Sequence, residues 1–172
     1  MKNKQSKEIV NHKTRITIEK FANDEAVKKG ISYDKSVLDA FLNPEDNNML
    51  VNAGINAFTN LLAGAGGTAF NNANSYIGVG DSSTAESAAQ TDLQAATNKL
   101  RKAMNATYPL SGTSQKITFQ ADFTSAEANY AWNEFAVFNA SSAGTMLNRK
   151  VSSQGTKTAG QTWRITLEIT FS

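Results

Sequence analysis

The chain contains no cysteine and only one histidine among its 172 residues. Without cysteine there are no disulfides, thiolate metal ligands or cysteine nucleophiles, so the fold depends on burial and hydrogen bonding alone. The single histidine, His12, lies in a polar N-terminal stretch. We therefore expect neither a Ser-His-Asp mechanism nor a histidine-based zinc site.

Long apolar runs are also missing, because no stretch approaches the ~20 residues that a membrane span needs. The N-terminus does not lead into the apolar segment of a secretory signal, so we expect no membrane insertion. The net charge is only +2, but residues 1–29 carry eight Lys or Arg against four Asp or Glu. Such a basic arm suits contact with nucleic acid or an acidic protein surface, and a solvated tail has the same composition. Of these, we do not expect direct nucleic-acid binding.

The C-terminal third has the clearest periodicity. Residues 163–171 alternate strictly between apolar and polar side chains, which is typical of a strand with one buried face. Residues 116–123 repeat this pattern, whereas residues 132–138 have apolar side chains on both faces, as a strand covered on both sides would. Three such strands without room for crossover helices predict an antiparallel sheet.

Four further segments have the character of strands. They are residues 14–21, 74–81, 99–104 and 146–151. With turn residues between them, about seven strands predict a mainly β protein, an antiparallel β-sandwich. The glycines at 155 and 160 predict a hairpin into the last strand.

One segment has helical spacing. Residues 49–64 predict an amphipathic helix that is capped by Asn47 or Asn48, ends at Gly64, and lies with its apolar stripe on the sheet or on another subunit. Gly54 in its middle suggests close backbone packing. Residues 36–42 are interpreted as one or two helical turns before a proline.

The predicted organisation is an extended N-terminal arm, residues 1–48, followed by a helix and β-sandwich domain, residues 49–172. The alternating arm residues are the candidate partner-binding site: Arg15, Ile16, Thr17, Ile18 and Glu19. Such a strand can join a sheet of its own subunit or add to the exposed edge of a neighbour. In the second case, deletion of residues 1–21 would abolish binding while the β domain still folds.

The remaining hypotheses, a glycosidase site and a calcium site, depend on carboxylates. Glu134 and Glu168 lie within predicted strands, and a β-sandwich glycosidase needs only two such groups. Neither stands in a recognisable motif, so we favour sheet carboxylates that bind no substrate. Asp81, Glu86 and Asp92 share a loop but lack the spacing of a known calcium loop, and a solvated loop is favoured.

Two other features have weaker functional interpretations. Trp132 and Trp163 are able to stack on a sugar ring, but both stand at the start of apolar strands, where core packing is the commoner fate of tryptophan. The glycines at 64–67 lack the Lys-Ser/Thr of a phosphate loop and follow a helix, so a helix end explains them better. We expect no catalytic residue, cofactor or metal.

Three stretches resemble a family of tailed-bacteriophage structural proteins: YIGVGDSSTAESAAQTDLQAATNK, AWNEFAVFNA and LNRKVSSQGTKTAGQTW. The resemblance covers roughly residues 50–172. The matching positions are Asn74–Asp81, Thr91–Leu93, Ala128–Phe135, Leu147–Arg149, Lys157–Thr158 and Thr162–Trp163. These motifs are structural, so no catalytic role follows from them.

The resemblance implies a non-enzymatic component of the virion, assembled in the host cytoplasm. The leading hypothesis is a capsid decoration (cement) protein that binds the major capsid protein as a homo-oligomer and stabilises the head. A tail, baseplate or fibre-attachment protein of the same particle is the first alternative. A carbohydrate-binding module is the second.

Overall fold

The computed structural model describes residues 12–39 and 48–172. In these ranges the chain forms ten strands and two helices. The strands are β1 (His12–Phe21), β2 (Ser32–Asp39), β3 (Met49–Leu50), β4 (Tyr76–Gly80), β5 (Lys99–Ala103), β6 (Leu110–Thr113), β7 (Lys116–Phe123), β8 (Glu134–Phe138), β9 (Met146–Val151) and β10 (Thr162–Phe171). The helices are α1 (Asp24–Lys28) and α2 (Asn52–Leu62).

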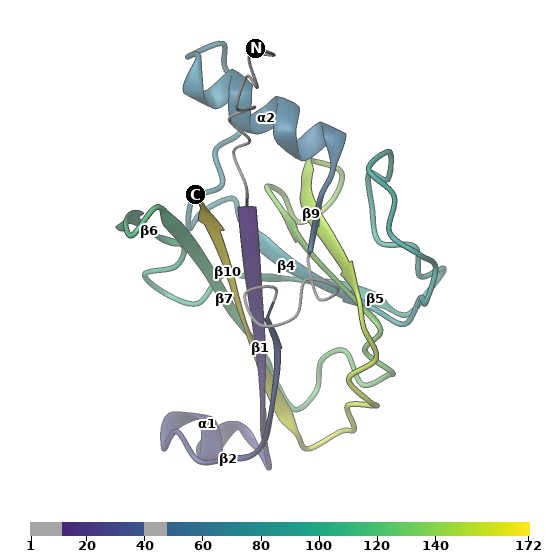
Figure 1. Ribbon diagram of the computed structural model, residues 1–172. Coiled ribbons are helices and arrows are strands. Elements are labelled where there is room, and N and C mark those ends of the chain that lie inside the picture. Colours follow the sequence, from purple (N-terminus) through teal and green to yellow (C-terminus); the bar gives the residue numbers. More distant parts are fainter. Residues whose placement is uncertain (1–11, 40–47) are drawn as a thin grey trace, which may run out of the picture.

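The strands form two five-stranded antiparallel sheets that pack together as a sandwich (Figure 1). Sheet A has the strand order β2-β1-β10-β7-β6, and sheet B has the order β3-β9-β8-β4-β5. Helix α2 lies across one end of the sandwich, and α1 lies at the opposite end (Figure 1). The predicted mainly β sandwich with an amphipathic helix is confirmed, with more strands than the sequence indicated.

Strand β10 is the centre of sheet A. It pairs with β1 on one side and with β7 on the other, so that Ile165 stands opposite Ile18 and Ala121. Ile165 and Leu167 are fully buried between the sheets, while the side chains between them face outward. The strict alternation of this segment therefore reports a strand with one covered face, as predicted.

Strand β8 is buried on both faces, which confirms the prediction from its sequence. Phe135 and Val137 belong to the core between the sheets. Ala136 and Phe138 point the other way, where they pack with Leu93 of the long loop between β4 and β5. That loop, and not a third sheet, covers the outer face of sheet B.

Strand β1 joins a sheet of its own subunit, which was one of the two alternatives for residues 14–21, so residues 12–39 belong to the sandwich and are not an extended arm; residues 1–11 and 40–47 lie outside the described ranges. Strand β1 pairs with β10 along one edge and with β2 along the other, inside its own sheet. Ile16 and Ile18 are buried in the core. Because both of its backbone edges are occupied, β1 cannot add to the sheet of a neighbour, and the boundary at residue 48 would divide sheet A. Deletion of residues 1–21 would remove the buried side chains Ile16, Ile18 and Phe21, so we expect it to destabilise the β domain.

Two other local predictions are wrong. The helical turns expected at 36–42 begin inside strand β2, where Leu38 stands opposite Ile16, while residues 40–42 lie outside the described ranges. Short apolar runs do not distinguish a helix from a strand by periodicity alone, and pairing with β1 decides the outcome. The hairpin expected at 155–160 is a crossover, because β9 belongs to sheet B and β10 to sheet A.

Helix α2 begins without the predicted asparagine cap. Met49–Leu50 first pair with β9 as strand β3, and the N-cap is Val51, which has no side-chain hydrogen bond. The first amide of the helix, that of Asn52, donates instead to the backbone oxygen of Ala88 at 2.8 Å. At the other end Gly64 has φ +66°, and its amide donates to the oxygen of Leu61, as predicted for a glycine stop.

The close packing expected at Gly54 is present. A Cβ atom at this position would lie 2.3 Å from the backbone oxygen of Leu147 in β9. Only glycine therefore allows α2 to approach the sheet to this distance. In the described part of the chain, neither helix has the length and hydrophobicity that a bilayer crossing requires.

We predict that Gly54→Ala destabilises the fold by about 1–3 kcal/mol, because overpacking against the β9 backbone outweighs the ~1 kcal/mol that alanine contributes to helix propensity. The measurement is urea unfolding followed by circular dichroism. The control is Asn56→Ala on the exposed side of the same helix, which should be neutral or slightly stabilising. Equal behaviour of the two variants would contradict the close contact.

Candidate functional site

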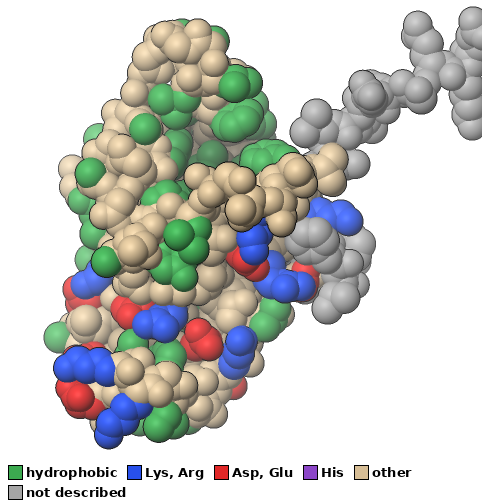
Figure 2. Space-filling view, turned by 90° about the vertical axis from the view of Figure 1, so that its left-hand side faces the viewer, with side chains coloured by type: hydrophobic (Ala, Val, Ile, Leu, Met, Phe, Trp, Pro, Cys, Tyr) green, Lys and Arg blue, Asp and Glu red, His purple; other side chains and the backbone are tan. Residues whose placement is uncertain are grey.

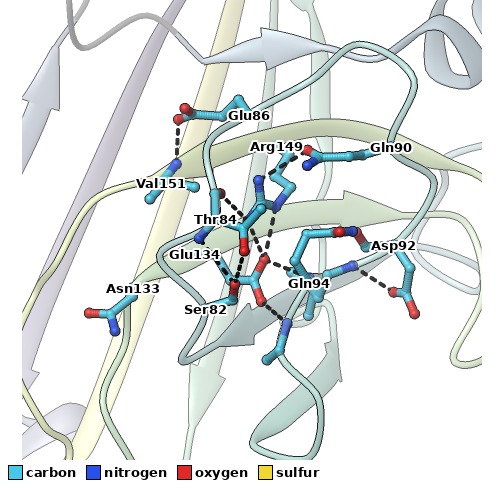
Figure 3. Close-up of polar contacts among 12 residues, drawn as sticks. Ser82, Thr84, Glu86, Gln90, Asp92, Gln94, Asn133, Glu134, Arg149 and Val151 are labelled. Carbon is cyan, nitrogen blue, oxygen red and sulfur yellow. Dashed lines mark hydrogen bonds and ion pairs between the residues drawn. The ribbon is translucent and has the colours of Figure 1, made fainter.

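The strongest polar cluster lies under the loop between β4 and β5 (Figure 3). Glu134 of β8 and Arg149 of β9 are both fully buried and form an ion pair, with 2.8 Å between Nη2 and Oε2. The carboxylate also accepts hydrogen bonds from the backbone amides of Gln94 and Ala95 at 2.9 and 2.8 Å. Its oxygens are thus shared between one guanidinium and two loop amides.

Arg149 holds the first half of the same loop. Its guanidinium donates to the backbone oxygens of Thr84 and Ala85 and to the side chain of Gln90 (Figure 3). Glu86 accepts a hydrogen bond from the backbone amide of Val151, so the loop is also fixed to the end of β9. Both buried charges are therefore neutralised and hydrogen-bonded, which is the condition for burying them.

The positions of Glu134 and Glu168 test the glycosidase hypothesis. Glu134 lies on the outer face of sheet B, under the loop, while Glu168 lies on the outer face of sheet A beside Lys116. Both sheets stand between the two carboxylates, and sheets pack about 10 Å apart. The pair cannot flank one glycosidic bond, and the favoured interpretation as sheet carboxylates agrees with their positions.

The calcium alternative is also not supported. The carboxylate of Asp81 accepts a hydrogen bond from the side-chain amide of Asn98, and that of Glu86 accepts one from the backbone amide of Val151. Asp92 pairs with Arg101 at 2.8 Å and with Lys99 at 3.2 Å. In the described ranges no group of three metal-ligating side chains comes together.

The two tryptophans form the centre of the core. Their rings lie edge to face, with centroids 4.8 Å apart and an interplanar angle of 68°. Trp132 is fully buried and Trp163 nearly so, and the indole of Trp132 donates to the backbone oxygen of Ala128. No face of either ring is available to a sugar, so core packing is confirmed and sugar stacking is wrong.

A buried lysine anchors another loop. The ammonium of Lys157 donates to the backbone oxygens of Thr124 and Glu127 and to Oδ1 of Asn129, at 2.8 to 2.9 Å. Burial lowers the pKa of Lys157 to about 8, and the charges of Asp24 and Glu127 act in the opposite direction. With these three hydrogen bonds the lysine holds the loop between β7 and β8 in place.

The structure splits the candidate arm residues between two faces of β1. Ile16 and Ile18 point into the core, whereas Arg15, Thr17 and Glu19 lie on the outer face of sheet A. Arg15 forms an ion pair with Asp39 of β2. These residues build the sheet. Contact of the outer three with a partner stays a prediction.

An apolar groove, which the sequence did not predict, opens between α2 and the end of sheet A. It encloses about 910 Å³. One wall is α2, with Ile55, Phe58 and Leu61; the other comes from the strand ends, with Ile169 and Phe171. Phe58 stacks on Phe171, with centroids 5.7 Å apart. We call α2 together with this groove the α2 face.

The polar groups in the groove are largely engaged with the protein itself. His12 Nε2 donates to the backbone oxygen of Asn48 at 3.0 Å, and Thr59 donates to the backbone oxygen of Asn56. Lys116 pairs with Glu168. A small-molecule site usually presents several convergent polar groups, so this groove suits apolar side chains better.

The segment that contains α2 carries no charge, although Lys116, paired with Glu168, lines the groove from the strand side. Residues 47–80 contain no Asp, Glu, Lys or Arg. Figure 2 shows the result on one side of the molecule: charged side chains gather in the lower half, and the upper part is hydrophobic or uncharged polar surface. On this side of the molecule the surface above the charged half is therefore mainly apolar or uncharged.

No protein-family model matches this chain, and no curated protein sequence matches it. The resemblance to tailed-bacteriophage structural proteins accordingly stays a prediction. The geometry adds that its motif residues have structural positions: Glu134 and Arg149 fix one loop, Lys157 fixes another, and the tryptophans fill the core.

We predict that Glu134→Gln destabilises the protein by about 3–5 kcal/mol, because it leaves a buried guanidinium without its counter-charge. Glu168→Gln, which breaks the partly exposed pair with Lys116, should cost about 0–1 kcal/mol. Urea unfolding of both variants measures the difference. If the two cost the same, the buried pair does not organise the loop as described.

The pKa of Lys157 predicts a pH dependence. Between pH 8 and 10.5 the unfolded chain retains a proton that the folded chain has lost at this residue, so stability rises with pH in this window. We expect the free energy of unfolding of the wild type, relative to Lys157→Met, to increase from pH 8 to pH 10. The difference should be constant below about pH 7, where both states keep the proton. A flat difference across pH 8 to 10 would contradict the lowered pKa.

Proposed function

We propose that the protein is a non-enzymatic structural component that works by protein–protein contact through the α2 face. The observation that carries this proposal is the row of exposed apolar side chains on α2 beside an open apolar groove. Exposed apolar surface of this kind, bounded by polar residues, typically marks a binding site. Ile55 and Phe58 are 44% and 49% exposed, and Leu62 is 78% exposed.

For the identity of the assembly we propose a tailed-phage particle, with a role as a decoration protein on the major capsid protein lattice. The support is the resemblance of residues 50–172, together with the structural positions of its motif residues. A repeated lattice multiplies weak contacts, because each attached copy raises the effective concentration of further contacts. A rigid sandwich that exposes apolar side chains at one end suits such attachment.

The test uses particles of the phage that encodes this chain, purified on a density gradient. We expect the chain to be present in many copies per particle and to be detected on the heads by gold-labelled antibody in electron microscopy. Antibody absorbed with the purified chain is the control. Label on tails would favour the tail, baseplate or fibre alternative, and absence of the chain from purified particles would overturn the proposal.

A further inference from the structure

We propose that α2 is a hinged lid on the end of the sandwich. Its C-terminal half moves away from the strand ends while its first turn stays fixed to β9, and the groove beneath the helix widens. The motion belongs to the isolated chain, so it goes beyond the proposed function and does not depend on it. Three features carry the proposal: a fixed start, a weakly attached remainder and a slack segment after the helix.

The start of α2 is held by backbone contacts. The amide of Val51, which is fully buried, donates to the backbone oxygen of Leu147 at 3.2 Å, and the amide of Asn52 donates to that of Ala88 at 2.8 Å. Gly54 is the only buried residue of the helix, and it touches the backbone of Leu147. Since this contact has backbone on both sides and no interlocking side chain, the helix is able to rotate there as about a pivot.

The rest of the helix is attached by few contacts. In the described part of the chain, the hydrogen bonds of residues 56–67 stay within the helix and its C-terminal turn. The main apolar contact is the stack of Phe58 on Phe171, and Phe58 is half exposed in spite of it. A segment with few buried apolar contacts opens at a lower free energy than the core does.

The segment that follows α2 is slack. Residues 63–67 are exposed and include three glycines, all with positive φ. A Cβ atom at Gly64 or Gly66 would meet no other atom within 4 Å, so the segment does not pack on the sandwich at these positions. The next polar attachment is at Thr68, whose backbone oxygen accepts a hydrogen bond from the side chain of Asn139 at 2.9 Å. The wide conformational range of glycine lets residues 63–67 follow the helix when it moves.

Opening of the lid uncovers the strand ends. Figure 1 shows α2 starting beside β9 and crossing the end of the sandwich. Ile169 lines the groove from the strand side and is only 1% exposed. Movement of α2 exposes this side chain and widens the groove, so that the groove accepts apolar side chains of different sizes.

The experiment places single cysteines in the full chain, which has none of its own. Ile169→Cys puts a thiol beneath α2. Its matched control, Ile165→Cys, puts one on the same face of β10 at a fully buried position outside the groove. Under native conditions we expect a maleimide to modify the thiol of Ile169→Cys at least about a hundredfold faster than that of Ile165→Cys, because local opening needs far less free energy than exposure of the core. Equal rates would overturn the proposal.

A second substitution assigns the opening to α2. Phe58→Leu removes the aromatic stack on Phe171, and in the Ile169→Cys chain we expect it to speed modification about two- to tenfold. The control is Leu62→Ala, on the same helix but exposed and outside the groove, which should leave the rate unchanged. If Phe58→Leu has no more effect than Leu62→Ala, the opening does not involve α2 and the proposal is wrong.

A third measurement leaves the core intact and uses two spin labels on exposed positions. One chain carries Leu62→Cys with Ser111→Cys of β6, and the matched chain carries Asn52→Cys with Ser111→Cys. Electron paramagnetic resonance should give a broader distance distribution for the first pair, because only the far end of the helix moves. Equally narrow distributions would contradict the hinge. None of these results bears on whether the chain is present in purified particles, so failure of this proposal and failure of the proposed function are distinguishable.

Discussion

The buried ion pair between Glu134 and Arg149 is the contact on which the rest of sheet B depends. It joins β8 to β9. The Glu134 carboxylate also accepts hydrogen bonds from the amides of Gln94 and Ala95, and the Arg149 guanidinium donates to the backbone oxygen of Thr84, so the pair fixes both halves of the loop from residue 82 to residue 95. That loop in turn places the backbone oxygen of Ala88 against the first amide of α2. The start of the helix is therefore held by a loop whose own position is set by two charges inside the protein.

Burying these charges is costly in itself, and a pair of well-packed apolar residues would often be at least as stable. The pair is specific, however, because each misplaced loop conformation leaves a buried charge without a partner. Lys157 acts in the same way on the loop between β7 and β8, where its ammonium donates to three oxygens. The protein thus uses charge in its interior to hold two loops in place.

Much of the fold follows from local pattern. The period of two in β7 and β10 identified them as strands, because each has one face toward solvent and one toward the core. The burial of β8 on both faces followed from its apolar residues at consecutive positions. Strand β2 was missed because it is an edge strand with Tyr33 and Val37 exposed, which obscures the alternation. The crossover between β9 and β10 was missed because turn residues do not specify which sheet the next strand joins.

The site was harder to predict than the fold. Glu134 and Arg149 are separated by fifteen positions along the chain and meet only because β8 and β9 pair. The groove depends on the direction in which α2 crosses the sandwich. Helical periodicity predicts which residues share a face of the helix, but it does not predict how the helix is oriented on the sheets. Two signals were nevertheless present in the sequence: the glycine in the middle of the helix and the uncharged stretch from residue 47 to residue 80.

These two signals have one physical meaning when they are taken together. An amphipathic helix normally covers the core with its large apolar residues, and its polar side faces water. Here Gly54 lets the helix approach the β9 backbone, while Ile55 and Phe58 line the groove and stay half exposed, and Leu62 is exposed. The polar side of the helix, with Asn52, Asn56 and Asn60, is exposed and uncharged, and the apolar side is only partly covered by the sandwich. Exposing these side chains to water is unfavourable by the area that they leave uncovered, and contact with another apolar surface removes that cost.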